Sequence, residues 1–269
     1  MEIKKIYLKD EFKNINTDAY VTIYSSSSNK FDENRLRKGL LVIPGGGYNH
    51  LSVRENEPVC LTFLKEDFVV ASLTYTVNNL DEFTPIDEGL GALIILKRLS
   101  KELHLNVNNI GVLGFSAGGH LASSLAIFRN DEKFIKHLEC TKEELDFKLL
   151  LLGYPVIDMY SYTHKGTMEL RTKSEEELKE KHSIQKHITS DFPPTFIFLT
   201  SEDQSVNPTN SLLLAQELIK NHVRVELHMF EEGPHGLALG TKASNPEANK
   251  EYPSFATWVK YALDFIDRN

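Results

Sequence analysis

The feature that most limits the possible folds is the alternation of short apolar runs with stretches of helical period. Each run is too short for a typical helix and is rich in large apolar residues, as in a strand buried on both faces. The runs are Leu40–Ile43, Phe68–Tyr75, Ile110–Phe115, Phe147–Gly153, Thr195–Thr200 and Val223–Phe230. Strands that alternate with helices predict an α/β fold with a mostly parallel sheet and helices on both faces.

Two earlier segments, Ile6–Leu8 and Ala19–Ile23, are β-branched and aromatic enough to form strands, and we expect them to pair as a hairpin. They bring the predicted sheet to eight strands. In a sheet of this kind, functional side chains gather at the carboxyl ends of the parallel strands. The residues just after each apolar run are therefore the first candidates for a site.

Capping residues predict several helix starts. Thr84 and Asn207 each precede a proline, so a capping side chain stands before a residue suited to the first turn. Thr141 and Ser174 are each followed three residues later by a glutamate, which is the spacing of a capping box. We expect the last helix to run from about Pro253 to Ile266.

The composition is that of a soluble globular enzyme or binding domain. The chain has 269 residues, of which 41% are hydrophobic and 25% charged, and its formal net charge is −8. This acidic balance argues against a nucleic-acid partner, because phosphate binding requires a basic face. Because no apolar run approaches the roughly 18 residues that a membrane span requires, we expect no membrane partner either.

The first residues, Met1–Lys5, offer no apolar stretch of signal-peptide length. Cys60 and Cys140 are too few and too far apart for a disulfide framework. We therefore expect a reduced, cytoplasmic protein. A chain of this length can bury a large core without a disulfide or a structural metal, and we predict one domain over residues 1–269. The sequence leaves both a monomer and a homodimer open.

The segment Asp158–Phe192 departs from the pattern because it is rich in charge and lies between two predicted core strands. It can be interpreted as a solvated surface helix. Alternatively, it is a small cap insertion over the site, which its position after the carboxyl end of a strand permits.

A serine stands at the point where a strand gives way to a helix. Gly114-Phe115-Ser116-Ala117-Gly118 follows the apolar run Ile110–Leu113 and opens the predicted helix Leu121–Phe128. A serine in this position must lie on a very tight turn, and the small residues two places before and after it let the flanking backbone pass closely. The pattern predicts that Ser116 is a nucleophile.

A serine hydroxyl is a poor nucleophile at neutral pH, so a base must take its proton. His235 lies in a glycine- and proline-containing loop just past the last predicted strand, and such a loop can carry an imidazole to Ser116. Three other histidines are alternatives. We interpret His228 as a half-exposed strand residue, His120 as a packing residue beneath the serine turn, and His50 as a surface residue or a substrate contact.

The imidazole also needs an anion that holds its tautomer and stabilises its charged form. Asp203 follows a predicted strand and stands at its carboxyl edge, and Glu202 and Asp158 are the alternatives. The resulting chain order is serine, acid, histidine. This order is that of α/β-hydrolases, whereas chymotrypsin-type and subtilisin-type enzymes use other orders.

Three consecutive glycines, Gly45 to Gly47, follow the apolar run Leu40–Ile43. Backbone N–H groups can approach a developing oxyanion only where no Cβ intervenes, and the N–H of Ala117 would point to the same place. A phosphate-binding loop is the competing interpretation, but no Gly-Lys-Ser/Thr follows and no dinucleotide fingerprint is present. Because the chain also lacks a His-Glu-x-x-His motif, we expect neither a metal nor a cofactor.

From about Lys38 to its end, the sequence resembles the α/β-hydrolase superfamily. More closely, it is similar to the bacterial lipase/esterase group that includes acetyl esterases and acetylxylan esterases. The segments that carry the resemblance are Pro44–Tyr48, Arg54–Pro58, Gly114–Ala122, Tyr154–Ile157, Pro193–Thr195, Glu202–Ser211 and Glu226–His235. The resemblance implies an acyl-serine mechanism with nucleophile Ser116, acid Asp203 and base His235. It also implies that the oxyanion donors are Gly46, Gly47 and Ala117.

We therefore expect a serine carboxylic ester hydrolase that acts on a small-molecule ester. A short, charged cap segment favours short acyl groups, above all acetyl, on a polar or sugar-like alcohol. We expect Tyr48 and His50 to contact the substrate. An amidase or peptidase with the same triad, and a non-catalytic binding module on the same fold, remain the alternatives.

Overall fold

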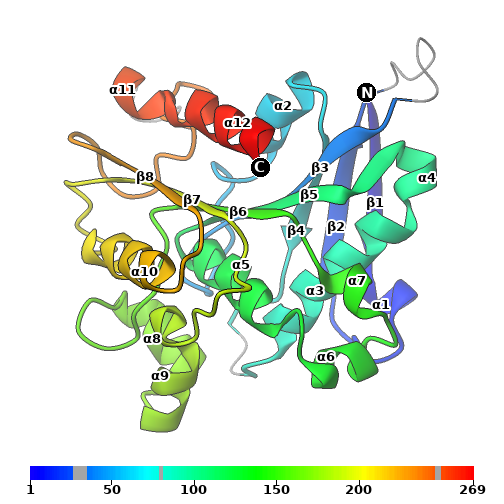
Figure 1. Cartoon of the computed structure of the whole chain (residues 1–269), viewed down its shortest axis with the longest axis horizontal. Coiled ribbons are helices and arrows are strands. Elements are labelled where there is room, and N and C mark those ends of the chain that lie inside the picture. The colour runs from blue at the N-terminus through cyan, green and yellow to red at the C-terminus, as the bar shows by residue number, and fades with distance from the viewer. Residues whose placement is uncertain (27–34, 79–80, 246–249) are drawn as a thin grey trace.

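An eight-stranded sheet runs through the middle of the molecule (Figure 1). The computed structural model describes residues 1–26, 35–78, 81–245 and 250–269. The strands are β1 (Glu2–Tyr7), β2 (Tyr20–Ser25), β3 (Arg37–Ile43), β4 (Val69–Thr74), β5 (Leu105–Phe115), β6 (Leu149–Gly153), β7 (Thr195–Thr200) and β8 (Val225–Phe230). They lie in the order β1-β2-β4-β3-β5-β6-β7-β8. Strand β2 is antiparallel to both of its neighbours, and the remaining pairs are parallel.

Helices cover both faces of the sheet (Figure 1). Helices α2 (Glu57–Lys65), α11 (Pro253–Ala256) and α12 (Trp258–Arg268) lie on one face. Helices α3 (Thr84–Arg98), α5 (Ala117–Phe128) and α10 (Thr209–Lys220) lie on the other. The shorter helices are α1 (Leu8–Glu11), α4 (Ser100–Leu103), α6 (Glu132–His137), α7 (Lys142–Leu145), α8 (Lys165–Thr172), α9 (Glu176–His182) and the 3-10 helix η2 (Ile184–Lys186).

The predicted strands and the early hairpin are confirmed, with shifts at their ends. Strand β1 begins at Glu2, well before Ile6, and stops at Tyr7 because Leu8 starts α1. Its first four residues are exposed at the edge of the sheet, which explains why the apolar signal was short. Strand β5 extends back to Leu105, where it pairs with Arg37 of β3.

The helix starts are confirmed only in part. Thr141 and Glu144 form the predicted capping box of α7. The prediction that Thr84 caps α3 is wrong, because the Asp81 carboxylate accepts the N–H of Thr84 and Thr84 lies inside the first turn. The capping box predicted for Ser174 is also wrong. Ser174 adopts a φ of 60° in the turn before α9, which begins at Glu176.

Two further helix predictions differ in detail. The Asn207 side chain accepts the N–H of Thr209, the first residue of α10, as a capping side chain does. The predicted last helix is divided at Thr257 into α11 and α12, and the second of these runs on to Arg268.

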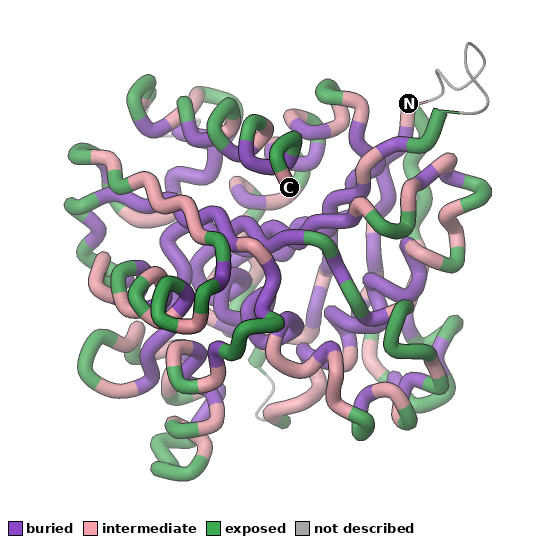
Figure 2. Tube along the Cα trace, viewed as in Figure 1, coloured by how far each residue is buried: buried purple, intermediate pink, exposed green. Residues whose placement is uncertain are grey.

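The central strands are buried on both faces and form the core (Figure 2). Trp258 of α12 is fully buried and stacks on Phe198 of β7, with the ring centroids 4.0 Å apart. Phe115, at the end of β5, packs edge-on against both of these rings. The strand that leads to Ser116 is therefore supported from beneath by rigid aromatic packing. No helix in the described ranges is long and apolar enough to cross a membrane.

Candidate active site

Ser116 lies on a strained turn between β5 and α5. Its φ of 52° and ψ of −120° are unusual for a residue with a side chain. The two flanking glycines make the turn possible. A Cβ on Gly114 would lie 2.3 Å from the carbonyl oxygen of Gly118, and a Cβ on Gly118 would lie 2.3 Å from that of Ile43. The small residues of the sequence motif are therefore required by backbone packing.

A continuous chain of hydrogen bonds joins the three residues predicted for the triad. Nε2 of His235 lies 2.8 Å from the Oγ of Ser116, and Nδ1 lies 2.6 Å from Oδ2 of Asp203. A carboxylate can only accept, so Nδ1 donates to Asp203 and Nε2 of the neutral ring is left to accept the serine proton. The structure thus brings together residues that come from three different loops.

The position of Asp203 is fixed from its other side. Its Oδ1 accepts the backbone N–H groups of Ser205 and Val206, each at 2.9 Å. The two alternative acids have other partners. Glu202 accepts the N–H of Gly233 through Oε2, and Asp158 accepts from Tyr162 and Gln185.

The alternative histidines lie where the sequence interpretation put them. Nε2 of His120 lies 2.9 Å from a carbonyl oxygen, so Nε2 donates and Nδ1 accepts from the hydroxyl of Tyr48. Burial lowers the pKa of His120 to about 4, and the ring is therefore neutral. His228 is partly exposed and stacks on Tyr261. His120 is therefore a packing residue beneath the serine turn, and His228 is a packing residue away from it.

The two residues expected to contact substrate differ in their positions. His50 lines the cavity at Ser116. Tyr48 does not lie among the cavity-lining residues, because its side chain is buried and its hydroxyl is bonded to His120. The adjacent Arg171 lies over the Tyr48 ring, with its guanidinium carbon 4.8 Å from the centroid.

The glycine loop turns beside Ser116. Gly46 and Gly47 have φ values of 123° and 63°, a region that favours glycine, and a Cβ on Gly46 would lie 2.1 Å from the carbonyl oxygen of His50. Across the described ranges, the N–H groups of Gly46, Gly47 and Ala117 have no hydrogen-bond acceptor. Gly46, Gly47 and Ser116 line the same cavity, so the N–H groups of the two glycines are available beside the serine, where an oxyanion would form.

Sequence reasoning missed the residues that tie this loop to the histidine loop. Glu55 is buried, and its two oxygens accept the N–H of Gly45 at 2.8 Å and the hydroxyl of Tyr154 at 2.7 Å. The same hydroxyl accepts the N–H of Ala238, three residues after His235. The Tyr154 ring also packs edge-on against the His235 ring, with centroids 4.8 Å apart. Glu55 and Tyr154 belong to segments that carried the family resemblance, but nothing in their spacing indicates this contact.

A cavity of about 470 Å³ opens above Ser116 and His235. Its lining combines polar and charged side chains with apolar ones, among them Leu51 and Val53. Its lining residues are Gly46, Gly47, Asn49, His50, Leu51, Ser52, Val53, Arg54, Glu55, Ser116, His164, Ser205, His235 and Gly236. His164 belongs to the charged segment Asp158–Phe192, so this segment contributes to the wall of the site. Sequence reasoning did not single out His164.

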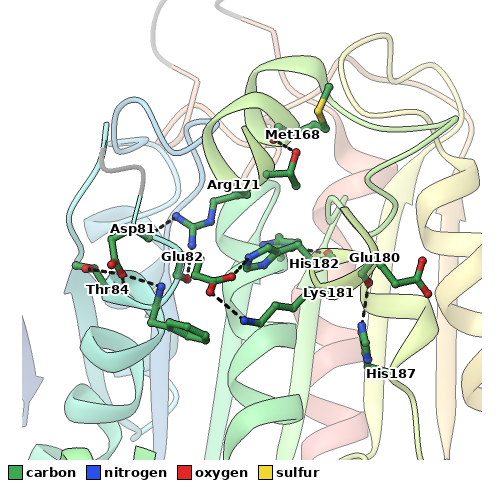
Figure 3. A network of polar contacts seen from close by, with 12 residues as sticks. Asp81, Glu82, Thr84, Met168, Arg171, Glu180, Lys181, His182 and His187 are labelled. Atoms are coloured by element: carbon green, nitrogen blue, oxygen red, sulfur yellow. Dashed lines mark hydrogen bonds and ion pairs between the residues drawn. The ribbon is translucent and has the colours of Figure 1, made fainter. Parts of the chain in front are cut away.

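A network of polar contacts holds α8 and α9 against the loop before α3 (Figure 3). Arg171 is 2% exposed and donates to the backbone carbonyls of Asp81 and Glu82. Lys181 forms an ion pair with Glu82 at 2.9 Å. Beside it, the Nε2 of His182 lies 3.5 Å from the second oxygen of Glu82, and burial strongly lowers the pKa of this histidine.

A known family model covers the glycine loop, Ser116 and Asp203, whereas His235 lies beyond its end. The BD-FAE family model matches residues 23–218, which is most of the chain. The chain belongs to the BD-FAE family. Its fold is the α/β-hydrolase fold, as the sequence predicted.

Three individual proteins illustrate how much of this chain is similar to known proteins. Endo-1,4-beta-xylanase B of Butyrivibrio fibrisolvens is 28% identical over 85% of this chain and 35% of its own length. The acetylxylan esterase of Xylanibacter ruminicola is 24% identical over 78% of this chain and 43% of its own. The chain thus spans less than half the length of these curated relatives.

The third relative is a solved structure. The acetyl ester-xyloside bifunctional hydrolase from Caldicellulosiruptor lactoaceticus is 30% identical and superposes with a TM-score of 0.82. The match covers 98% of this chain and 96% of that one. The similarity to this protein therefore covers almost the whole fold.

Proposed function

We propose that this BD-FAE family member is a serine carboxylic ester hydrolase. The observation that carries the proposal is the continuous hydrogen-bond chain from Ser116 through His235 to Asp203. Such a chain activates a hydroxyl that would otherwise be a poor nucleophile. The names of the relatives, an acetylxylan esterase and an acetyl ester-xyloside hydrolase, support the same reaction class.

In this mechanism the Oγ of Ser116 attacks the ester carbonyl carbon while Nε2 of His235 takes the hydroxyl proton. The N–H groups of Gly46, Gly47 and Ala117 stabilise the tetrahedral oxyanion. The imidazolium then protonates the leaving alcohol, and an acyl-serine remains. A water molecule attacks the acyl-serine with His235 again as the base, which releases the acid and restores the serine. Apart from this water molecule and the substrate, the proposed steps use only groups of the chain.

We further propose that the preferred acyl group is short and the alcohol polar. The lining of the cavity includes Asn49, His50, Arg54 and Ser205, which suit hydroxyl groups better than hydrocarbon. A long acyl chain would need a broad apolar surface, because each buried methylene contributes about 0.8 kcal/mol. The cap segment does not offer one, since α9 consists mainly of glutamate and lysine. Acetylated sugars are the substrate class that fits these features.

A cytoplasmic location remains a prediction. Both cysteines are free, and burial raises the pKa of the Cys60 thiol to about 12, which makes it unreactive. The protein thus contains no structural disulfide among its described residues that would require an oxidising compartment.

The proposal can be tested with p-nitrophenyl esters from acetate to decanoate and with acetylated xylosides. We expect kcat/KM to be highest for acetate and a serine-directed phosphonate to label Ser116, as mass spectrometry of the peptide would show. The Ser116→Ala variant serves as the control and should neither react nor turn over. A maximum at eight carbons or beyond would contradict the short-acyl proposal. A folded protein that is neither active nor labelled would contradict the hydrolase itself.

A further inference from the structure

His164 is a histidine of the active-site cavity that the proposed mechanism does not use. It lies directly before α8, in the cap segment, and shares the cavity wall with Ser116 and His235. Its side chain is half-buried. A histidine in this position can act as a base, as a packing residue or as a hydrogen-bond donor to substrate, and its contacts distinguish these roles.

The hydrogen bonds of His164 fix its tautomer. The backbone N–H of Thr167 donates to Nδ1 at 3.2 Å, and the Thr167 hydroxyl lies 2.9 Å from the same nitrogen. Because a backbone N–H can only donate, Nδ1 accepts and the proton of the neutral ring is on Nε2. Burial and the neighbouring His235 lower the pKa of His164, which keeps the ring neutral at pH 7. Nε2 therefore carries an N–H.

That N–H is available to a ligand. Within the described part of the chain, Nε2 of His164 has no hydrogen-bond partner, although the ring lines the cavity. The ring edge lies over the glycine loop, because a Cβ on Gly47 would be 3.3 Å from Cε1 of His164. The absence of a side chain at Gly47 is what leaves room for the imidazole.

The surroundings of the ring indicate which part of the substrate it meets. The oxyanion already has three backbone donors in Gly46, Gly47 and Ala117. His235 must face the leaving oxygen in order to protonate it, and His164 lines the same cavity as His235. We therefore assign the Nε2–H of His164 to the side of the alcohol rather than the acyl group.

We propose that His164 is a specificity-determining residue whose Nε2–H donates a hydrogen bond to a hydroxyl oxygen of the alcohol, next to the ester bond. This inference rests on the proposed ester hydrolysis and names the alcohol it favours, a vicinal diol or sugar monoester. The donor is pre-oriented. The N-terminus of α8 holds Nδ1, and Arg171 within α8 anchors that helix to the loop before α3.

The test compares two acetates of similar size that differ in one hydroxyl, 2-hydroxyethyl acetate and propyl acetate. The variant is His164→Asn, because asparagine is a good N-cap and can keep the bond to the N–H of Thr167 while removing the imidazole Nε2–H. We expect kcat/KM to fall about tenfold for the hydroxyl ester and less than about twofold for propyl acetate, as loss of one hydrogen bond predicts. The matched control is His187→Asn, on the same cap segment but outside the cavity lining, which should leave the ratio of the two substrates unchanged.

Several outcomes would overturn the inference. An equal loss on both acetates would show that His164 serves the oxyanion or the general fold. A second outcome is a His164→Asn protein that unfolds thermally like the wild type and keeps the same ratio of kcat/KM for the two acetates. This result would show that the ring does not bind the hydroxyl of the substrate. A wild-type protein that hydrolyses neither acetate would instead refute the proposed function, and the role of His164 with it.

Discussion

At the scale of single residues, the candidate chemistry depends on one oxygen of Asp203. Its Oδ1 is held by two backbone N–H groups, so Oδ2 is directed at Nδ1 of His235. We expect Asp203→Asn to lower kcat about 10⁴-fold, because the amide favours the wrong imidazole tautomer. Steady-state kinetics on p-nitrophenyl acetate would measure the change.

Asp158→Asn is the control for this prediction. The Asp158 carboxylate is bonded to Tyr162 and Gln185 rather than to His235, so kcat should stay within about threefold of the wild type. If Asp158→Asn lowered kcat more than Asp203→Asn, the acid of the triad would have to be Asp158, in the segment after β6.

The buried His120 makes stability depend on pH. Its pKa is about 4 in the folded protein and about 6.5 in the unfolded chain, so between these values the unfolded chain binds more protons. The stability that depends on a neutral His120 is therefore present above pH 6.5 and is lost as the pH falls toward 4. Arg171 acts in the same direction by making protonation of the ring more costly, whereas the His182 carbonyl, which accepts from Nε2 of His120, raises the pKa of His120 and opposes the effect of burial.

This prediction can be measured with urea unfolding at pH 4.5 and 7. We expect the free energy of unfolding to fall less between these values in His120→Gln than in the wild type, by about 2 kcal/mol, as a shift of this size implies. The comparison must be between the two proteins, because Asp87 has a raised pKa of about 6 and contributes with the opposite sign. Identical pH slopes would mean that His120 does not titrate as its burial requires.

At the scale of elements, two loops of the site need glycine for different reasons. The turn between β5 and α5 needs it because the backbone passes closely, whereas the loop at His235 needs it because of a positive φ. A Cβ on Gly114 would meet the backbone of Gly118 at 2.3 Å, which no side-chain movement can relieve. We expect Gly114→Ala to cost about 3 kcal/mol or more in the free energy of unfolding. Gly236 has a φ of 79° but open space around it, so Gly236→Ala should cost only about 1 kcal/mol of backbone strain.

Thermal and chemical unfolding of the two alanine variants would test this difference. Equal destabilisation would show that the positive φ matters more than the close approach of the backbone. A Gly114→Ala protein as stable as the wild type would contradict the packing argument for the serine turn.

At the scale of the whole molecule, buried hydrogen bonds and apolar contacts attach the charged segment Asp158–Phe192 to the α/β body. Arg171 provides two of them, to the carbonyls of Asp81 and Glu82. We expect Arg171→Ala to raise the rate of amide hydrogen exchange in α8 and α9, because each buried hydrogen bond to a charged group contributes about 1.5–3 kcal/mol. Exchange monitored by mass spectrometry would localise the effect.

The control for this experiment is Lys179→Ala on α9. Lys179 pairs with Glu176 at 3.8 Å on the surface, and such pairs contribute at most about 1 kcal/mol. Exchange in α8 that is equally fast in both variants would mean that Arg171 does not anchor the segment.

The sequence predicted the eight strands of the sheet, though not their order, because each buried strand is a short apolar run. It also predicted that Ser116, Asp203 and His235 come together at the ends of strands, and the structure places them within hydrogen-bond distance. It did not predict how α8 and α9 dock, because their contacts join residues about ninety positions apart, such as Arg171 and Asp81, without any periodic signal. For the same reason, nothing in the residues around His164 indicated that it reaches the cavity, and nothing around Tyr48 indicated that it would be buried.

The hydroxyl of Tyr154 bridges Glu55, behind the glycine loop, and Ala238, beyond His235. The two loops are therefore not independent modules for protein engineering. A longer or foreign loop grafted between residues 44 and 56 would have to carry a carboxylate at the position of Glu55, or the loop that presents the imidazole would lose its support as well. Recombination of the glycine loop alone must therefore preserve this carboxylate, and a graft that cannot preserve it must exchange both loops together.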